Sequence, residues 1–159
     1  MKTIELNKGF TALIDDDDYE LVSRYKWYVQ KVCYCYYAIA HSKTVNGKRT
    51  TLRMHRLITG VNIGTQVDHI NHDGLDNTRG NLRTCTQSEN QQNKRSKNGT
   101  SKYKGVHLRN GSKKWRSSIR VSKKLIDLGC FTSETEAAIA YNTAAIKYFG
   151  EFACLNEFN

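Results

Sequence analysis

The stretch QVDHINHDGLDNTRGNLRTCTQSENQ, residues 66–91, decides how the centre of this 159-residue chain folds. It predicts a strand over Gln66–Ile70, a polar loop over Asn71–Asn81, a second strand over Leu82–Thr86 and a helix over Ser88–Arg95. The loop is rich in Asn, Asp and Gly, the residues that must form turns in a chain without proline. We therefore expect a small strand–loop–strand–helix unit.

Side chains suited to hydrolysis of a phosphodiester gather in this unit. Asp68 and Asn90 offer oxygen ligands to one hard divalent cation, and Mg²⁺ binds in this way, with one or two protein groups, several waters and substrate phosphates. A neutral His69 beside that ion could take a proton from attacking water. The carbonyl of Asn81 could hold the His69 Nδ1–H, which leaves Nε2 as the base. Because adjacent strand residues face opposite sides, Asp68 and His69 can flank one phosphate only if the strand ends or bends there.

The same run resembles the HNH nuclease family, whose core is a ββα-metal hairpin plus helix. The matching residues are Asp68-His69-Ile70-Asn71, Asp76-Asn77, Arg79, Asn81-Leu82-Arg83 and Thr86-Gln87-Ser88-Glu89-Asn90. Residues 52–58, LRMHRLI, are similar to the segment that precedes this core in the phage and intron-encoded branch.

The resemblance implies a role for each matching polar residue. Asp68 and Asn90 would hold the metal, His69 would activate water, and Asn81 would orient His69 or the water. The third motif position is Asn instead of the His of many relatives, which suits the homing-endonuclease branch and favours Mg²⁺ or Mn²⁺ over Zn²⁺. Arg79 and Arg83 are candidate phosphate clamps.

The carboxy-terminal part is strongly basic. The chain carries a net charge of +10, and residues 94–124 hold 12 Lys and Arg with no Asp or Glu. Such an excess predicts a polyanionic partner, most simply nucleic acid. Strands are expected over Tyr103–Arg109, Lys114–Ser122 and Lys124–Phe131, and a helix is expected between Ser133 and Gly150. On the second strand, alternation predicts a polar face of Arg116, Ser118 and Arg120, with Trp115, Ser117, Ile119 and Val121 on the other face.

This part resembles the APETALA2/ethylene-response-factor DNA-binding domain. The matching pieces are Tyr103-Lys104-Gly105-Val106, Lys114-Trp115, Ile119-Arg120, Leu128-Gly129-Cys130-Phe131, Glu136 to Tyr141, and Leu155-Asn156. The family's DNA-contacting positions fall on Lys104, His107, Arg109, Ser118 and Arg120, and the strand pattern adds Arg116. His107, Ser118 and Asp127 depart from the plant pattern, so the family's sequence preference does not transfer.

The first 60 residues predict short strands, at Thr11–Ile14, Tyr25–Tyr28 and Tyr34–Ala40, and a hairpin turn at Asn46-Gly47. The acidic run Asp15 to Asp18 is expected to be a solvated turn. His55 is expected to be structural, with DNA contact as the alternative. The region is expected to flank the core and to add DNA contacts.

These patterns predict an α+β protein in four segments: a β-rich region (1–60), an HNH core (61–95), a basic linker (96–102) and an APETALA2-like domain (103–159). The predicted function is a metal-dependent, sequence-directed DNA endonuclease acting on double-stranded DNA, with a non-catalytic DNA-binding regulator as the alternative. We expect Mg²⁺ or Mn²⁺, no small-molecule cofactor, and a monomer. No apolar run approaches the roughly 18 residues of a membrane span, and no signal peptide is evident, so we expect a cytoplasmic protein, in a host cell if phage-encoded.

Overall fold

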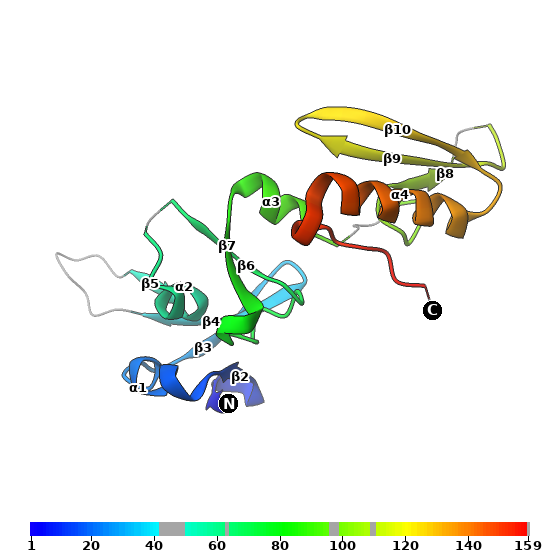
Figure 1. The fold of residues 1–159 in the computed structure, drawn as a ribbon. Helices are drawn as coiled ribbons and strands as arrows, with labels where there is room; N and C mark the ends of the chain where they lie inside the picture. The colour runs from blue at the N-terminus through cyan, green and yellow to red at the C-terminus, as the bar shows by residue number, and fades with distance from the viewer. Residues whose placement is uncertain (42–49, 63, 96–98, 109–110, 159) are drawn as a thin grey trace. The chain divides into compact units, whose positions relative to one another are not determined.

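The computed structural model describes residues 1–41, 50–62, 64–95, 99–108 and 111–158. The chain forms two compact units, Met1–Asn90 and Gln91–Asn159 (Figure 1). Both units combine helices with small antiparallel sheets, which confirms the predicted α+β class. Among the described residues, no helix is both long enough and apolar enough to cross a membrane.

Three small sheets form in the described part of the first unit. β1 (Lys2–Glu5) pairs with β2 (Thr11–Ile14), β4 (Cys35–His41) lies between β3 (Tyr28–Val32) and β5 (Thr51–Arg53), and β6 (Gln66–His69) pairs with β7 (Leu82–Cys85). The helices are α1 (Tyr19–Val22), α2 (Met54–Thr59) and α3 (Gln87–Gln92), whose last two residues belong to the second unit. Short 3₁₀ turns lie at Asn7–Gly9 (η1), Asp16–Asp18 (η2) and Arg79–Asn81 (η3). The expected strands from 11, 34, 66 and 82 are confirmed to within one or two residues.

One hydrophobic core serves this unit. Ile14 of β2, Val22 of α1 and Met54 of α2 are fully buried, and Leu82 of β7 joins the same cluster. Val67 of β6 packs against this cluster. The β-rich beginning of the chain and the β6–β7 hairpin are therefore stabilised by the same apolar contacts.

The predicted strand over Tyr25–Tyr28 is wrong. Trp27 is 3% exposed and its indole N–H donates to the Val22 carbonyl at 2.8 Å, so this segment is a bend that fills the core. A buried Trp satisfies its one donor at the nearest carbonyl, and here that carbonyl ends α1. The helix α2 within LRMHRLI was not anticipated, and the expected turn at Asn46-Gly47 lies outside the described residues.

The second unit is a three-stranded sheet covered by one long helix. β8 (Val106–Leu108), β9 (Trp115–Val121) and β10 (Lys124–Phe131) follow the order β10-β9-β8, and α4 (Glu134–Phe149) lies across them (Figure 1). Ile119 and Val121 meet Tyr141, Ala144 and Ala145 of the helix, as the alternation of β9 predicted. A short 3₁₀ turn, η4 (Gly150–Phe152), leads into the carboxy-terminal tail.

Helix α4 begins at Ser133 and ends at Gly150 as the sequence predicted, but the expected reciprocal capping box of Ser133 and Glu136 is not formed. The Thr135 N–H donates to Ser133 Oγ at 3.2 Å, which satisfies one of the unpaired donors of the first turn. Gly150 ends the helix with a positive φ of 54°. The first strand, β8, is shorter than expected, since residues before Val106 form turns.

Candidate active site

The β6–β7 hairpin places the acidic and imidazole side chains of the candidate site. Its register sets Asp68 opposite Arg83 and His69 opposite Leu82. β6 ends at His69, and the Ile70 N–H then donates to the Asn81 carbonyl at 3.0 Å as the chain turns into the loop. β6 thus ends at His69, which meets the condition under which Asp68 and His69 could flank one phosphate.

Helix α3 brings Asn90 to the face of the hairpin that carries Asp68. A capping box begins the helix, because the Glu89 N–H donates to Thr86 Oγ1 at 3.2 Å and the Thr86 N–H donates to Glu89 Oε2 at 2.7 Å. The Asn90 Nδ2–H donates to Gln66 Oε1 at 2.6 Å. Gln66 and Asp68 share one face of β6, since side chains alternate along a strand. The predicted strand–loop–strand–helix unit is confirmed, although α3 is shorter than expected.

Asp68 and Arg83 form a largely buried ion pair. The guanidinium donates to Oδ2 of Asp68 from Nε at 3.1 Å and from Nη2 at 2.9 Å, and the two side chains are 9% and 12% exposed. Both contacts fall on the same carboxylate oxygen, so Arg83 fixes the orientation of Asp68. Sequence reasoning gave Arg83 to a phosphate; here its cross-strand partner is the carboxylate.

His69 is buried and faces an amide oxygen. Its Nε2 lies 3.4 Å from Oδ1 of Asn77, whose Nδ2 donates to the Leu75 carbonyl at 3.1 Å. The Asn77 amide nitrogen is bound elsewhere, so its oxygen faces the ring, an arrangement in which Nε2 carries the hydrogen and Nδ1 is the basic nitrogen. This is the reverse of the expected tautomer, and the Asn81 carbonyl instead accepts from the Ile70 N–H. Burial lowers the pKa of His69, while the Asn77 contact and the charges of nearby carboxylates, foremost Asp68, oppose that shift.

Asn77 itself is held by the β1–β2 hairpin. Its N–H donates to the Leu13 carbonyl at 2.8 Å, and the Leu13 N–H donates to the Leu75 carbonyl at 2.8 Å. Asn77 has no exposed surface. The sequence matches Asp76-Asn77 to the family motif but indicates no role for Asn77, since its partner Leu13 lies far away along the chain.

Asn81 closes the loop between the two strands. Its Oδ1 accepts from the Asn71 N–H at 3.0 Å, and its Nδ2–H donates to the Asp76 carbonyl at 2.8 Å. Asp76 in turn accepts from the Asn71 amide at 2.7 Å. The side chain of Asn81 therefore stabilises the loop that starts directly after His69.

Two aromatic side chains pack beside His69. The rings of His55 and His69 meet edge to face with centroids 5.0 Å apart, and Tyr37 lies 5.8 Å from His69 and 5.9 Å from His55. Burial lowers the pKa of His55 to about 3, with smaller contributions from His69 and two arginines. Gly74 is buried and packs on this group, because a Cβ there would collide with the backbone of Tyr36 and the ring of Tyr37. The burial of His55 agrees with the expectation that this residue has a structural role.

Arg79 is bound by the acidic run near the amino terminus. Its guanidinium donates to both oxygens of Asp18, at 2.9 and 2.6 Å, and its N–H donates to Asp15 Oδ2 at 2.7 Å. Asp18 is 3% exposed in this pair and Arg79 is 59% exposed. Asp15 and Asp18 thus bind the loop between β6 and β7 through Arg79, whereas Asp16 and Asp17 are exposed, as expected for a solvated turn.

The donor set of the site fits a hard divalent cation with few protein ligands. The described residues contain no cluster of three or more His, Cys, Asp or Glu that would make a closed metal cage. Asp68 and Asn90 instead offer a carboxylate and an amide oxygen on one face of the hairpin. Mg²⁺ accepts such sparse ligation because it keeps several waters.

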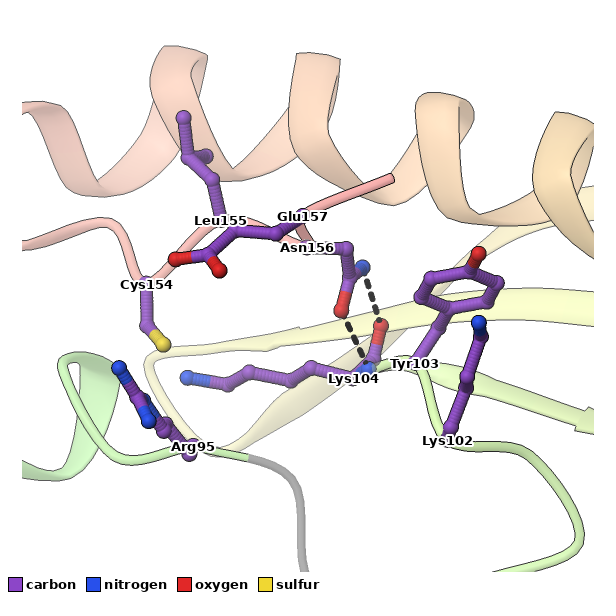
Figure 2. Close-up of a pocket in the computed structure, with 8 residues that line it drawn as sticks. All are labelled: Arg95, Lys102, Tyr103, Lys104, Cys154, Leu155, Asn156 and Glu157. Atoms are coloured by element: carbon purple, nitrogen blue, oxygen red, sulfur yellow. Dashed lines mark hydrogen bonds between the residues drawn. The ribbon is translucent and has the colours of Figure 1, made fainter. Parts of the chain in front are cut away.

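In the second unit, Lys104 lies in a cationic pocket of about 330 Å³ (Figure 2). Its ammonium donates to the Gln92 carbonyl, and burial lowers its pKa. The side chain of Asn156 binds the backbone of Lys104 on both sides, at 2.6 and 3.1 Å. The Leu155-Asn156 motif is explained by this contact. The lining residues are Arg95, Lys102, Tyr103, Lys104, Cys154, Leu155, Asn156 and Glu157.

Four further candidate DNA-contacting residues share the sheet face away from α4: His107, Arg116, Ser118 and Arg120. His107 lies opposite Arg116, and Ser118 and Arg120 follow on the same side of β9. His107 and Arg120 are exposed, whereas Ser118 is 9% exposed. Arg116 donates to Asp127 Oδ2 at 2.8 Å, so part of its charge is neutralised locally. Arg109 lies outside the described residues.

Known proteins match both the site and the whole chain. The sequence profile of the HNH endonuclease family matches residues 54–92. An uncharacterized HNH endonuclease of Acanthamoeba polyphaga mimivirus is 32% identical over 156 residues, which covers 94% of this chain and 76% of the viral protein. The chain belongs to the HNH endonuclease family. HNH nucleases generally use a divalent metal ion.

Two plant proteins match a shorter part of this HNH endonuclease. An AP2-like ethylene-responsive transcription factor of Arabidopsis thaliana is 43% identical over 60 residues, covering 36% of this chain and 17% of the factor. A second ethylene-responsive transcription factor of that plant is 46% identical over 56 residues, covering 34% and 30%. These matches support the APETALA2-like assignment, and together with the nuclease family they point to DNA as substrate or partner.

Proposed function

We propose that the protein is a metal-dependent endonuclease of the homing type that hydrolyses phosphodiester bonds of double-stranded DNA. The observation that carries the proposal is the end of β6, where Asp68 and His69 are adjacent and Asn90 lies on the Asp68 face. A carboxylate, an amide and a neutral imidazole at one strand end are the groups that this reaction needs.

His69 acts as the general base in this proposal. Its hydrogen-bearing Nε2 is directed at Asn77, so Nδ1 takes the proton of the attacking water. Burial keeps the ring neutral near pH 7, which is the state that a base requires. Asn81 acts indirectly, by fixing the loop that follows His69.

Asp68 and Asn90 would hold the divalent cation, Mg²⁺ or Mn²⁺. When bound there, the ion would stabilise the charge of the phosphorane and of the leaving 3′ oxygen. Arg83 positions Asp68 through Oδ2. Arg79 keeps more than half of its side chain exposed beside the loop and is the better candidate for a phosphate contact.

The second unit would recognise the target sequence on DNA. His107 and Arg120 are exposed on the sheet face away from α4, with Arg116 and Ser118 beside them. A sheet of this kind can enter the major groove, where arginine reads guanine edges. Arg116→Ala with Arg120→Ala should weaken specific binding while leaving the hydrolytic groups intact.

The test is cleavage of a plasmid library that carries fragments of the encoding genome, followed by sequencing of the new ends. The wild-type chain with Mg²⁺ should cut at recurrent positions, and chelator should abolish the cuts. His69→Ala should lower the rate by about 10²- to 10⁴-fold, the usual contribution of a general base.

A matched control keeps the comparison specific. His72 lies three positions beyond His69 at a φ of 67°, and His72→Asn preserves a residue that tolerates this conformation. The control should cleave as the wild type does. Cleavage by His69→Ala at the wild-type rate would refute the assignment of the base, and cleavage in chelator would refute the metal.

A further inference from the structure

The first unit carries a strongly segregated charge. Residues 21–67 hold eight Lys and Arg and no Asp or Glu, whereas the acidic residues of this unit lie before and after that segment. Five of these basic residues, Arg24, Lys26, Lys31, Arg53 and Arg56, are described in the structure. A positively charged segment beside a candidate nuclease site favours binding of a polyanion.

The sheet β3–β4–β5 presents two different faces. Val29, Ala38 and Leu52 lie on the face that joins the hydrophobic core. The opposite face, here called the outer face, follows from the register, which sets Tyr28 opposite Ile39, Ile39 opposite Arg53, and Gln30 opposite Tyr37. Its residues are Tyr28, Gln30, Val32, Cys35, Tyr37, Ile39, His41, Thr51 and Arg53.

The outer face combines cations, hydrogen-bonding groups and aromatic rings. Gln30, His41 and Arg53 are exposed, and Tyr28 is half-buried with its ring 6.0 Å from that of His41. The Lys26 ammonium lies 5.9 Å from the Tyr28 ring centroid. None of the three strands, all fully described, contains a carboxylate. Interleaved cations and aromatics without carboxylates are typical of a surface that binds nucleic acid.

The outer face leads directly to the candidate base. Tyr37 lies on this face, and its ring is 5.8 Å from the ring of His69. The positive charge of Arg53 acts electrostatically on both Tyr37 and His55. A DNA strand with one phosphodiester at His69 would therefore continue past the cations of the outer face.

We propose that the outer face of β3–β4–β5 binds the backbone of double-stranded DNA next to the bond that is cut. Lys26 and Arg53 contact phosphates, Gln30 and Thr51 donate hydrogen bonds, and Tyr28 packs on a sugar. This assignment of the outer face extends the proposed endonuclease function and rests on it. It supplies affinity that does not depend on base sequence.

The experiment measures DNA binding in chelator with the His69→Ala chain, so it does not depend on cleavage. A duplex of random sequence is titrated by fluorescence anisotropy at several salt concentrations, with Lys26→Ala plus Arg53→Ala added to that chain. Each lost phosphate contact should reduce the slope of log affinity against log salt by about 0.9, so the pair should reduce it by about 1.8. At physiological salt, affinity should fall roughly tenfold.

The matched control removes the same charge elsewhere in the unit. Lys31 lies on the opposite face of β3, near the Tyr36 ring, and Lys2 lies on β1 over the Tyr19 ring. Lys2→Ala plus Lys31→Ala should leave the salt slope within a few tenths of the parent value. Melting temperatures of both pairs identify any variant that fails to fold, and lysine acylation of the unmutated chain then serves as the independent measurement.

Acylation read by mass spectrometry should show Lys26 protected by DNA while Lys2 and Lys31 stay reactive. Equal salt slopes in the two variant pairs, or an unprotected Lys26, would overturn the proposal. Competition by polyglutamate as strong as that by DNA would assign the face to an acidic protein and overturn it as well. A chain that binds in this way but does not cleave would contradict the proposed function alone.

Discussion

His55 makes the stability of the first unit depend on pH in a calculable way. The side chain is 6% exposed, and its pKa is lowered to about 3, while an unfolded histidine titrates near 6.5. Between these values the unfolded chain binds a proton that the folded chain excludes, so the free energy of unfolding falls as pH falls from 6.5 towards 3.

The size of this effect follows from the shift. Each pKa unit corresponds to about 1.4 kcal/mol, so complete titration across the window costs about 5 kcal/mol. Domains of this size are stable by about 5–15 kcal/mol, so this loss is a third or more of the total, and the first unit should be markedly less stable in mild acid. The groups that face His55 are His69, Tyr37, Arg53 and Arg56; the pKa of His69 is also lowered, so it acts in the same direction.

The assay is urea unfolding between pH 4 and pH 7.5 in a Trp115→Phe background. Trp27 is then the tryptophan that reports on the first unit, and its indole is buried in the core of that unit. His55→Phe keeps an aromatic ring next to Tyr37 and removes the titration. Its unfolding free energy should decline less steeply with acid than that of the parent chain. Parallel curves for the two proteins across this range would show that His55 does not cause the pH dependence.

Three further substitutions test the packing and the orientation of the site. Gly74→Ala should destabilise the first unit by about 1–3 kcal/mol and reduce cleavage, because the new Cβ meets the backbone of β4, whereas Gly80→Ala, with open space around it, should be tolerated in urea unfolding. Asn77→Ala should lower kcat about 10- to 100-fold with little change in KM, since the substitution frees the imidazole without touching DNA; an unchanged kcat would contradict its orienting role. Gly105→Ala should unfold the second unit as followed by Trp115 fluorescence, because Gly105 has a φ of 76° and its Cβ would enter the ring of Tyr141; a stable variant would show that the turn can shift.

The sequence was most informative where contacts are local. The β6–β7 hairpin and α3 lie within one stretch, and the capping box of Thr86 and Glu89 sets the start of the helix from four consecutive residues. Alternation along β9 likewise predicted that Ile119 and Val121 meet the alanine-rich helix. Periodicity and capping depend on residues that are close together in the sequence, so they predict strands and helices that are set by local contacts.

The sequence did not predict the protein partners of the charged side chains. Arg79, the candidate for a phosphate contact, also binds Asp18, 61 positions away. Lys104, a candidate DNA contact, has its ammonium half-buried against the Gln92 carbonyl. A charged side chain has no periodic signature of its own, and its partner is set by which loops the core brings together.

The local sequence was sufficient to predict the ββα unit, the candidate residues Asp68, His69 and Asn90, and the basic sheet with its helix. The orientation of those residues depends on tertiary contacts. The ring of His69 is set by Asn77, which the β1–β2 hairpin holds, and by Tyr37 and His55 from two other elements. Folding creates these contacts because burial of a shared apolar core joins segments that have no local reason to meet.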